Sequence, residues 1–329
     1  MPTLTAPSHP LDGQPPSPAL VDAYGRRIRK LRVSLTDQCN LRCQYCMPVN
    51  ATFMDPPHLL SAEEYALIVA ELLTYGVAEV RLTGGEPLLR PGFVTIVEHL
   101  ARLGIPKLSL TTNGILLDRY FDSLYNAGIH HLNISLDSLE AQTYKTITYG
   151  HHLERVLANI DQARQRGFHL KINMVVMRGI NDHEVLDFVA LSQKMGIEVR
   201  FLELMRIGYA CQIQAERFVS AQELRQRIAA HHTLHPTSQP QDATSFNFTT
   251  TDGAHIGFIA SESQPFCGHC SRWRLSADGV LRACLLKESG IPLRGLNAAQ
   301  RAEAYQALLS MKPYLRPPEV THMMHHIGG

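Results

Sequence analysis

The sequence has no run of about 18 consecutive apolar residues, so it offers no segment that could span a membrane. It also has no excess of charge of either sign, because 31 Lys and Arg residues face 30 Asp and Glu residues. A general nucleic-acid-binding protein would need a basic excess, so that class is excluded. The first 20 residues lack the apolar stretch of a signal peptide. A hydrophobic share of 45% excludes wholesale disorder. We expect a soluble cytoplasmic protein, and its length suits about two domains or one large α/β barrel with an appendage.

Cysteines are few and unevenly placed. Of the seven, six form two groups of three, and Cys211 lies alone between the groups. An odd number in tight groups fits a disulfide framework poorly, and a reducing cytosol disfavours disulfides. The pattern therefore predicts metal ligation by two triplets, which are Cys39, Cys43 and Cys46, and Cys267, Cys270 and Cys284.

Short apolar runs alternate with longer amphipathic segments, as in repeated βα units. Six strands are predicted at 31–36, 79–83, 107–112, 131–136, 170–176 and 198–204. Five helices are predicted between them at 61–75, 93–103, 119–126, 153–166 and 183–195. Ser61 and Glu64 have the spacing of a capping box, and each helix ends just before a glycine.

Six βα units form either an open doubly wound sheet or a partial barrel, and the motifs after the strands suit both. The alternation of strands and helices ends near residue 215. After it, 231–253 is polar and rich in predicted loops, and a helix is predicted at 298–309. We therefore predict an α/β protein with a smaller C-terminal α+β layer. The expected parts are a flexible proline-rich arm at 1–24, the βα region at 25–215 and the C-terminal region at 216–329.

The first cysteine triplet has the spacing C-x3-C-x2-C directly after the first predicted strand. Three thiolates can hold three corners of a 4Fe–4S cluster and leave the fourth iron open. A zinc site would need a fourth ligand, and His58 is the first candidate; a redox thiol pair is a third reading. A Gly-Gly-Glu-Pro segment follows the next strand at 84–87, where glycines permit a close backbone approach.

The second triplet has the spacing C-x2-C-x13-C. It favours another 4Fe–4S cluster with an iron left for a substrate atom, while His269 keeps a zinc site open as the alternative. Cys211 is interpreted as an ordinary thiol.

These motifs together resemble the radical S-adenosylmethionine (SAM) superfamily and, within it, the MoaA family of GTP 3′,8-cyclases of molybdenum cofactor biosynthesis. The resemblance covers about residues 24–329. Its segments are LRVSLTDQC at 31–39, CMP at 46–48, RLTGGEP at 81–87, TTNG at 111–114, NISLD at 133–137, RFLELM at 200–205 and the terminal IGG at 327–329.

The resemblance implies a six-unit partial TIM-type barrel, two 4Fe–4S clusters held by the two triplets, and SAM as cofactor. It implies GTP as substrate, an electron donor, a homodimer, and pyranopterin monophosphate synthase as a pathway partner. The positions that match SAM contacts are Tyr45, Gly85, Ser135 and Met205. The positions that match GTP contacts are Arg32, Arg81, Thr111, Lys171, Arg200, Arg272, Trp273 and Arg274. No side chain is assigned as a general base.

Two further expectations follow from the resemblance. Family members usually carry a lysine where this chain has Glu79, so we expect somewhat weaker GTP binding. The final glycines, Gly328 and Gly329, are expected to reach into the active site, whereas the tail histidines His322, His325 and His326 are expected to be solvated. The alternatives are another radical SAM enzyme with an auxiliary cluster, acting on a peptide or cofactor, and a zinc-stabilised nucleotide-binding protein without catalytic activity.

Overall fold

The computed structural model describes residues 19–317, 320 and 322–328. Most of the predicted arm, residues 1–18, lies outside the described residues. From residue 19 onward the chain is packed, because Leu20 is fully buried and Asp22 forms a 2.6 Å ion pair with Arg26. The prediction of a flexible arm is therefore wrong for residues 19–24.

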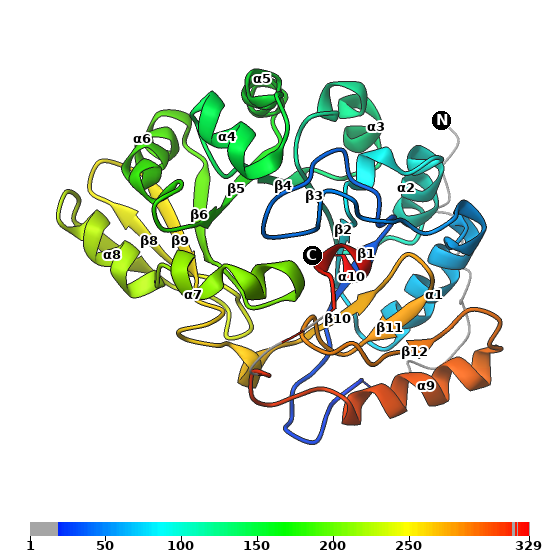
Figure 1. Cartoon of the computed structure of the whole chain (residues 1–329). Helices are drawn as coiled ribbons and strands as arrows, with labels where there is room; N and C mark the ends of the chain where they lie inside the picture. Colours follow the sequence, from blue (N-terminus) through cyan, green and yellow to red (C-terminus); the bar gives the residue numbers. More distant parts are fainter. Residues whose placement is uncertain (1–18, 318–319, 321, 329) are drawn as a thin grey trace, which may run out of the picture.

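A single twelve-stranded sheet carries the fold, in the order β12-β11-β10-β1-β2-β3-β4-β5-β6-β9-β8-β7. Its centre is the six predicted strands, all parallel: β1 (Lys30–Ser34), β2 (Glu79–Thr83), β3 (Lys107–Thr112), β4 (His131–Ser135), β5 (His169–Val176) and β6 (Glu198–Glu203). The sheet curves into a barrel that does not close (Figure 1). Of the two readings left open by the sequence, the partial barrel is the observed one.

Helices cover the outside of the curved sheet (Figure 1). They are α1 (Ala62–Thr74), α2 (Phe93–Ala101), α3 (Phe121–Asn126), α4 (Ala141–Thr148), α5 (Leu153–Gln165) and α6 (Val185–Met195). The predicted capping box of α1 is confirmed, since Ser61 accepts a hydrogen bond from the Glu64 amide and the Glu64 side chain accepts one from the Ser61 amide. The buried apolar side chains of these strands and helices form one continuous cluster, which is the main core.

The C-terminal region does not form a separate layer, because its strands extend the same sheet at both edges. β10 (Arg272–Leu275) pairs in parallel with β1 and continues into β11 (Val280–Arg282) and β12 (Ile291–Pro292). At the other edge β9 (His255–Ile259) pairs in parallel with β6. It is followed outward by β8 (Phe246–Thr250) and β7 (Leu234–Thr237), so the prediction of loop for 231–253 is wrong in part.

Four more helices complete the described chain: α7 (Gln214–Arg217), α8 (Ala221–Ala229), α9 (Ala298–Ser310) and α10 (Met324–Ile327). The last of these, α10, lies in the middle of the open barrel (Figure 1). None of the helices in the described residues combines the length and the apolar character that a membrane span requires.

Candidate active site

The first cysteine triplet lies on a loop that follows β1 and is held against the end of α4. The amides of Arg42 and Gln44 donate hydrogen bonds to the carbonyls of Thr148 and Ile147, each at 2.9 Å. Burial raises the pKa of the Cys39 thiol to about 11 and that of Cys46 to about 12. Because thiols must lose their protons to ligate a metal, a positively charged centre is what would bring these buried groups to the thiolate form.

The two glycines after β2 are required by the backbone of this same loop. A Cβ atom on Gly85 would lie 2.3 Å from the Gln38 carbonyl oxygen, and one on Gly84 would lie 2.6 Å from that of Thr36. Any side chain would therefore push the β2 turn away from the segment that leads to Cys39. The sequence predicts a close backbone approach to a ligand at this motif; the close partner in the structure is the chain itself.

Glu86 ties the same turn to β3. Its buried carboxylate accepts hydrogen bonds from Thr112 Oγ1 and the Asn113 amide, both at 2.7 Å, and from the Leu88 amide at 3.1 Å. Asn113 in turn donates to Asn40, next to Cys39, at 2.7 Å. Burial raises the pKa of the Glu86 carboxyl to about 7. The glutamate therefore positions the cysteine loop through Asn113.

A cavity of about 140 Å³ opens beside this loop and is lined by all three cysteines of the first triplet and by Gly85. A neighbouring cavity of about 240 Å³ is lined by all three cysteines of the second triplet. The two cavities share five lining residues, which are Tyr45, Thr111, Ser135, Asp137 and Met324. The two triplets thus face adjoining spaces inside one barrel.

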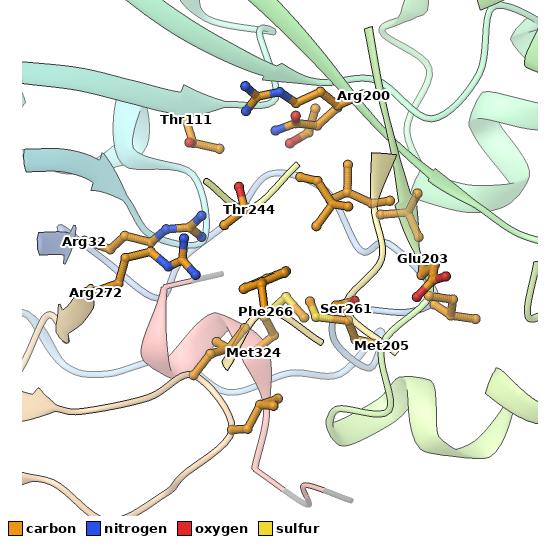
Figure 2. Close-up of a pocket in the computed structure, with 18 of the residues that line it drawn as sticks. Arg32, Thr111, Arg200, Glu203, Met205, Thr244, Ser261, Phe266, Arg272 and Met324 are labelled. Atoms are coloured by element: carbon orange, nitrogen blue, oxygen red, sulfur yellow. The ribbon is translucent and has the colours of Figure 1, made fainter. Parts of the chain in front are cut away.

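The larger cavity brings together most of the predicted contact residues. Besides the second triplet, it is lined by Tyr45, Ser135, Met205, Arg32, Arg81, Thr111, Arg200, Arg272 and Arg274. Figure 2 shows Arg32 and Arg272 reaching into it from one side and Arg200 from another. The sequence motifs gave no signal for Phe266, Thr244 and Ser261, which also line it.

Two predicted contacts lie elsewhere. Lys171 lines a third cavity at the N-terminal ends of the strands, where its Nζ lies 2.6 Å from Glu198 Oε2. Trp273 is fully buried in the core, with its ring centroid 6.5 Å from that of Tyr305. Because side chains alternate along a strand, Arg272 and Arg274 face the cavity and Trp273 faces away. The assignment of Trp273 to GTP is therefore wrong, and its role is packing.

The arginines repel one another in the absence of an anion. Burial, with the charges of Arg274, Arg81 and Arg272, lowers the pKa of Arg32 well below its usual value. Burial and the charge of Arg200 lower the pKa of Arg81 to about 10, and burial with the charge of Arg272 does the same for Arg274. Arg200 forms an ion pair with Glu198, so the group is partly neutralised. The excess of guanidinium charge that remains favours a ligand of high negative charge.

The second triplet is assembled from a turn after 266 and the end of β11. Lys312, buried and not suggested by any motif, places its Nζ 3.4 Å from Cys270 Sγ and donates to the carbonyls of Arg272 and Ala283. Burial opposes ionisation of Cys270, but the charges of Arg272 and Lys312 outweigh it and lower the pKa of the thiol to about 6. This cysteine is therefore prepared as a thiolate ligand.

The spacing of the sulfur atoms distinguishes zinc from a larger cluster. Ligands about 2.3 Å from a tetrahedral zinc ion lie roughly 3.8 Å from one another. Among the described residues, Glu140, His183 and Glu184 form the one group of three potential ligands that all lie within 4.8 Å of one another, so neither cysteine triplet is as compact as a zinc site. His269 is exposed, with its Nδ1 3.3 Å from Gln241. Both triplets fit an iron–sulfur cluster better than zinc.

The C-terminal tail enters the barrel mouth. The carbonyl of Gly328 accepts a hydrogen bond from Arg274 Nη1, and a Cβ on Gly328 would lie 2.7 Å from both Ser34 Cβ and Thr83 Oγ1. Gly329 lies outside the described residues. The expectation of solvated histidines is wrong for His325, which is 2% exposed, and for His322, which lies 2.8 Å from the Leu285 carbonyl.

Comparisons with known proteins agree with this geometry. The Radical SAM superfamily model matches residues 33–191, and the Molybdenum Cofactor Synthesis C model matches 197–320. A GTP 3′,8-cyclase from a Synechocystis species is 56% identical over 96% of both chains. Another, from Pseudomonas savastanoi, is 39% identical over 90% of this chain and 93% of the relative.

The solved structures give the fold. Streptococcus suis SuiB bound to S-adenosylmethionine is 14% identical, with a TM-score of 0.66, and the match covers 87% of this chain and 69% of that one. Similarity at this level of identity shows a shared architecture only. The sequence relatives and the family models show that the chain belongs to the GTP 3′,8-cyclase family within the radical SAM superfamily.

Proposed function

We propose that this chain cyclises GTP to 3′,8-cyclo-7,8-dihydro-GTP, the first step of molybdenum cofactor biosynthesis. The observation that carries the proposal is the arrangement of two cysteine triplets on adjoining cavities, with a group of arginines lining the cavity of the second triplet. The family gives the reaction as radical SAM chemistry of the lyase class, and the cofactors are SAM and two 4Fe–4S clusters.

When bound, these cofactors supply a 5′-deoxyadenosyl radical that takes H3′ from the ribose, after which C3′ joins guanine C8 and an electron and a proton complete the product. Cys39, Cys43 and Cys46 would hold the cluster that carries SAM. Tyr45, Gly85, Ser135 and Met205 lie on the adjoining cavity walls and would contact SAM. Their part is to orient the cofactor against the substrate.

The substrate would span the larger cavity. Cys267, Cys270 and Cys284 would hold the second cluster beside the guanine. The triphosphate would neutralise the arginine group formed by Arg32, Arg81, Arg200, Arg272 and Arg274, with Thr111 as a further donor. Each hydrogen bond to a charged group contributes about 1.5–3 kcal/mol, and the mutual repulsion of the unliganded arginines adds to this gain. Lys171, in the third cavity, would reach the phosphates from below.

Tyr45 is positioned by a residue that the sequence did not single out. Its hydroxyl donates to Asp137 Oδ2 at 2.7 Å, and Asp137 Oδ1 accepts from the Val175 amide at 2.8 Å. The aspartate therefore fixes a cavity-wall tyrosine to the ends of β4 and β5. This arrangement supports a preorganised SAM site, because the ring does not have to be ordered when the cofactor binds.

Four finer points belong to the same proposal. The location would be the reducing cytoplasm, since no disulfide joins the cysteines of the described chain. We also propose a homodimer and an external electron donor. The product would pass to pyranopterin monophosphate synthase, since the reaction gives the precursor that this enzyme uses.

The test is anaerobic reconstitution followed by incubation with GTP, SAM and a strong reductant. We expect about eight irons per chain, 5′-deoxyadenosine and a cyclised nucleotide. The variants Cys39→Ser and Cys267→Ser should each hold about four irons and form no cyclised product, whereas Cys211→Ser, outside both triplets, should behave as the wild type. Bound zinc, or about four irons in the wild type, would count against the two-cluster site.

A further inference from the structure

The third cavity lies at the end of the barrel opposite the first triplet. It is lined by the first residues of five neighbouring strands, Lys30, Glu79, Lys107, His131 and His169. It shares Arg32, Arg81, Arg200, Thr244 and Arg272 with the larger cavity above it. A ligand that reaches the arginine group from above therefore has a further space beyond it.

This cavity is strongly basic. Seven Lys and Arg residues line it, against the two acidic residues Glu79 and Asp242. The protein as a whole has a net charge of only +1. Glu198 also pairs with two of these cations, Lys171 and Arg200, so the local excess is four positive charges. Such an excess is suited to a compact polyanion such as a chain of phosphate groups.

Lys30 is the cation at this end of β1. It lies two residues before Arg32, so both side chains point to the same side of the strand. The Lys30 side chain is 18% exposed, and its Nζ lies 3.1 Å from Asp242 Oδ1 and 3.8 Å from Glu79 Oε1. Glu79 is its register partner on β2, as Arg81 is the partner of Arg32. Two layers of paired residues thus face the interior, one of arginines and one of Lys30 and Glu79.

We propose that Lys30 binds the terminal phosphate of GTP, so that this layer distinguishes the triphosphate from shorter nucleotides. The inference rests on the proposed function, which places the nucleoside beside the second triplet and the phosphates at the arginine layer. Two residues of a β-strand advance about 6.6 Å, so Lys30 lies one step further along the phosphate chain than Arg32.

The acidic partners have a defined part in this arrangement. Glu79 and Asp242 hold the Lys30 ammonium at the cavity wall before the substrate binds, which restricts a long and flexible side chain. From the sequence, Glu79 is expected only to weaken GTP binding by replacing a cation. In the structure its register partner on β1, Lys30, supplies a cation beside it.

The experiment compares nucleotides of different length on the reconstituted holoenzyme. Binding of GTP, GDP and GMP is measured by anaerobic calorimetry without SAM, so that no turnover occurs. Lys30→Met keeps the apolar stem of the side chain and removes the ammonium. Lys194→Met is the matched control, because Lys194 lies exposed in the last turn of α6, outside the three cavities.

For Lys30→Met we expect the Kd for GTP to rise by about ten- to a hundredfold, which is the loss of one hydrogen bond to a charged group. The Kd for GMP should change less than about twofold, the melting temperature should stay near that of the wild type, and Lys194→Met should bind all three nucleotides normally.

Unchanged GTP binding by Lys30→Met would overturn the inference. So would an equal loss for all three nucleotides, since that is the result of a structural role. In both cases wild-type GTP binding leaves the proposed function standing, whereas a wild type that binds no GTP would overturn that function and this inference with it.

Discussion

Gly328→Ala tests whether the docked C-terminal tail is needed for activity. The residue has φ +78°, a left-handed conformation that costs an L-residue about 1–2 kcal/mol. Its new Cβ would lie 2.7 Å from Ser34 Cβ and Thr83 Oγ1, which are buried atoms of two central strands. Overpacking of this kind typically costs about 1–3 kcal/mol, so the total strain is about 2–5 kcal/mol.

This strain should release the tail and leave the barrel intact. The tail consists of the four-residue helix α10 and the glycine end, and short terminal elements open at the low end of a protein's stability range. A cost of 2–5 kcal/mol lowers the docked population, relative to the released one, by about thirty- to a few thousandfold. Release also removes the Gly328 carbonyl from Arg274. We therefore expect strongly reduced GTP turnover with little change in melting temperature.

Gly196→Ala is the matched control. Gly196 has φ +65° at the end of α6, but a Cβ there would meet no atom within 4 Å. It should lose about 1–2 kcal/mol of stability from the backbone strain alone and keep full activity. Turnover and melting temperature are measured for both variants, together with the rate of C-terminal digestion by a carboxypeptidase. If Gly328→Ala turns over GTP as fast as Gly196→Ala, the docked tail has no part in the reaction.

Three more substitutions test the supports of the site. Folding raises the pKa of the Glu86 carboxyl from 4.5 to about 7, so the protonated carboxyl stabilises the folded state fully below about pH 4.5, and this stabilisation is lost as the pH rises through about 7. The loss is about 3 kcal/mol of the free energy of unfolding. Between pH 5 and pH 8 the melting temperature of Glu86→Gln should therefore fall less than that of the wild type. Lys312→Met removes the donor to two carbonyls, so it should lower the free energy of unfolding by about 2–5 kcal/mol and reduce the iron held by the second triplet. A melting temperature and an iron content equal to those of the wild type would contradict the role given to this lysine. Gly85→Ala should prevent assembly of the cysteine loop, because its Cβ would lie 2.3 Å from the Gln38 carbonyl; iron analysis showing a normal first cluster would refute this.

The sequence predicted those parts of the fold that are encoded locally. The six central strands and the five helices that end at glycines are observed within a few residues of their predicted bounds, as at α1, where the Ser61 cap is also confirmed. Helix α4 was missed although Gly150 follows its end, because its start carries no recognisable signal. Glu140 makes no side-chain cap there, and the helix ends at Thr148, followed by Tyr149, a non-glycine residue with φ +55°.

The edge strands could not be predicted because their character depends on distant partners. β8 is formed of half-buried residues that pair with β9, and β10 owes its place to pairing with β1, some 240 positions earlier in the chain. The assignment of Trp273 shows a signal that was available. Had 272–274 been recognised as a strand, alternation would have placed the tryptophan opposite its two arginine neighbours.

Of the site, the sequence supplied the ligand-type residues but not what holds them. Cysteine spacing and the arginine positions are local patterns, whereas Lys312 reaches Cys270 from 42 residues away and Asp137 reaches Tyr45 from 92 residues away. Such contacts have no signature in one sequence, because a buried lysine or aspartate looks like any other until the fold brings its partner near it.

Both edges of the open barrel are built from the later part of this sequence. The strands at both edges of the sheet, and the glycine that meets Arg274, all come from residues after 230. Synthesis runs from the N-terminus, so the loop of the first triplet and its surrounding βα units emerge long before the walls that confine the substrate. We therefore expect a chain that is cut after β6 to lack both these edge strands and the second cysteine triplet, and so to be unable to enclose a nucleotide.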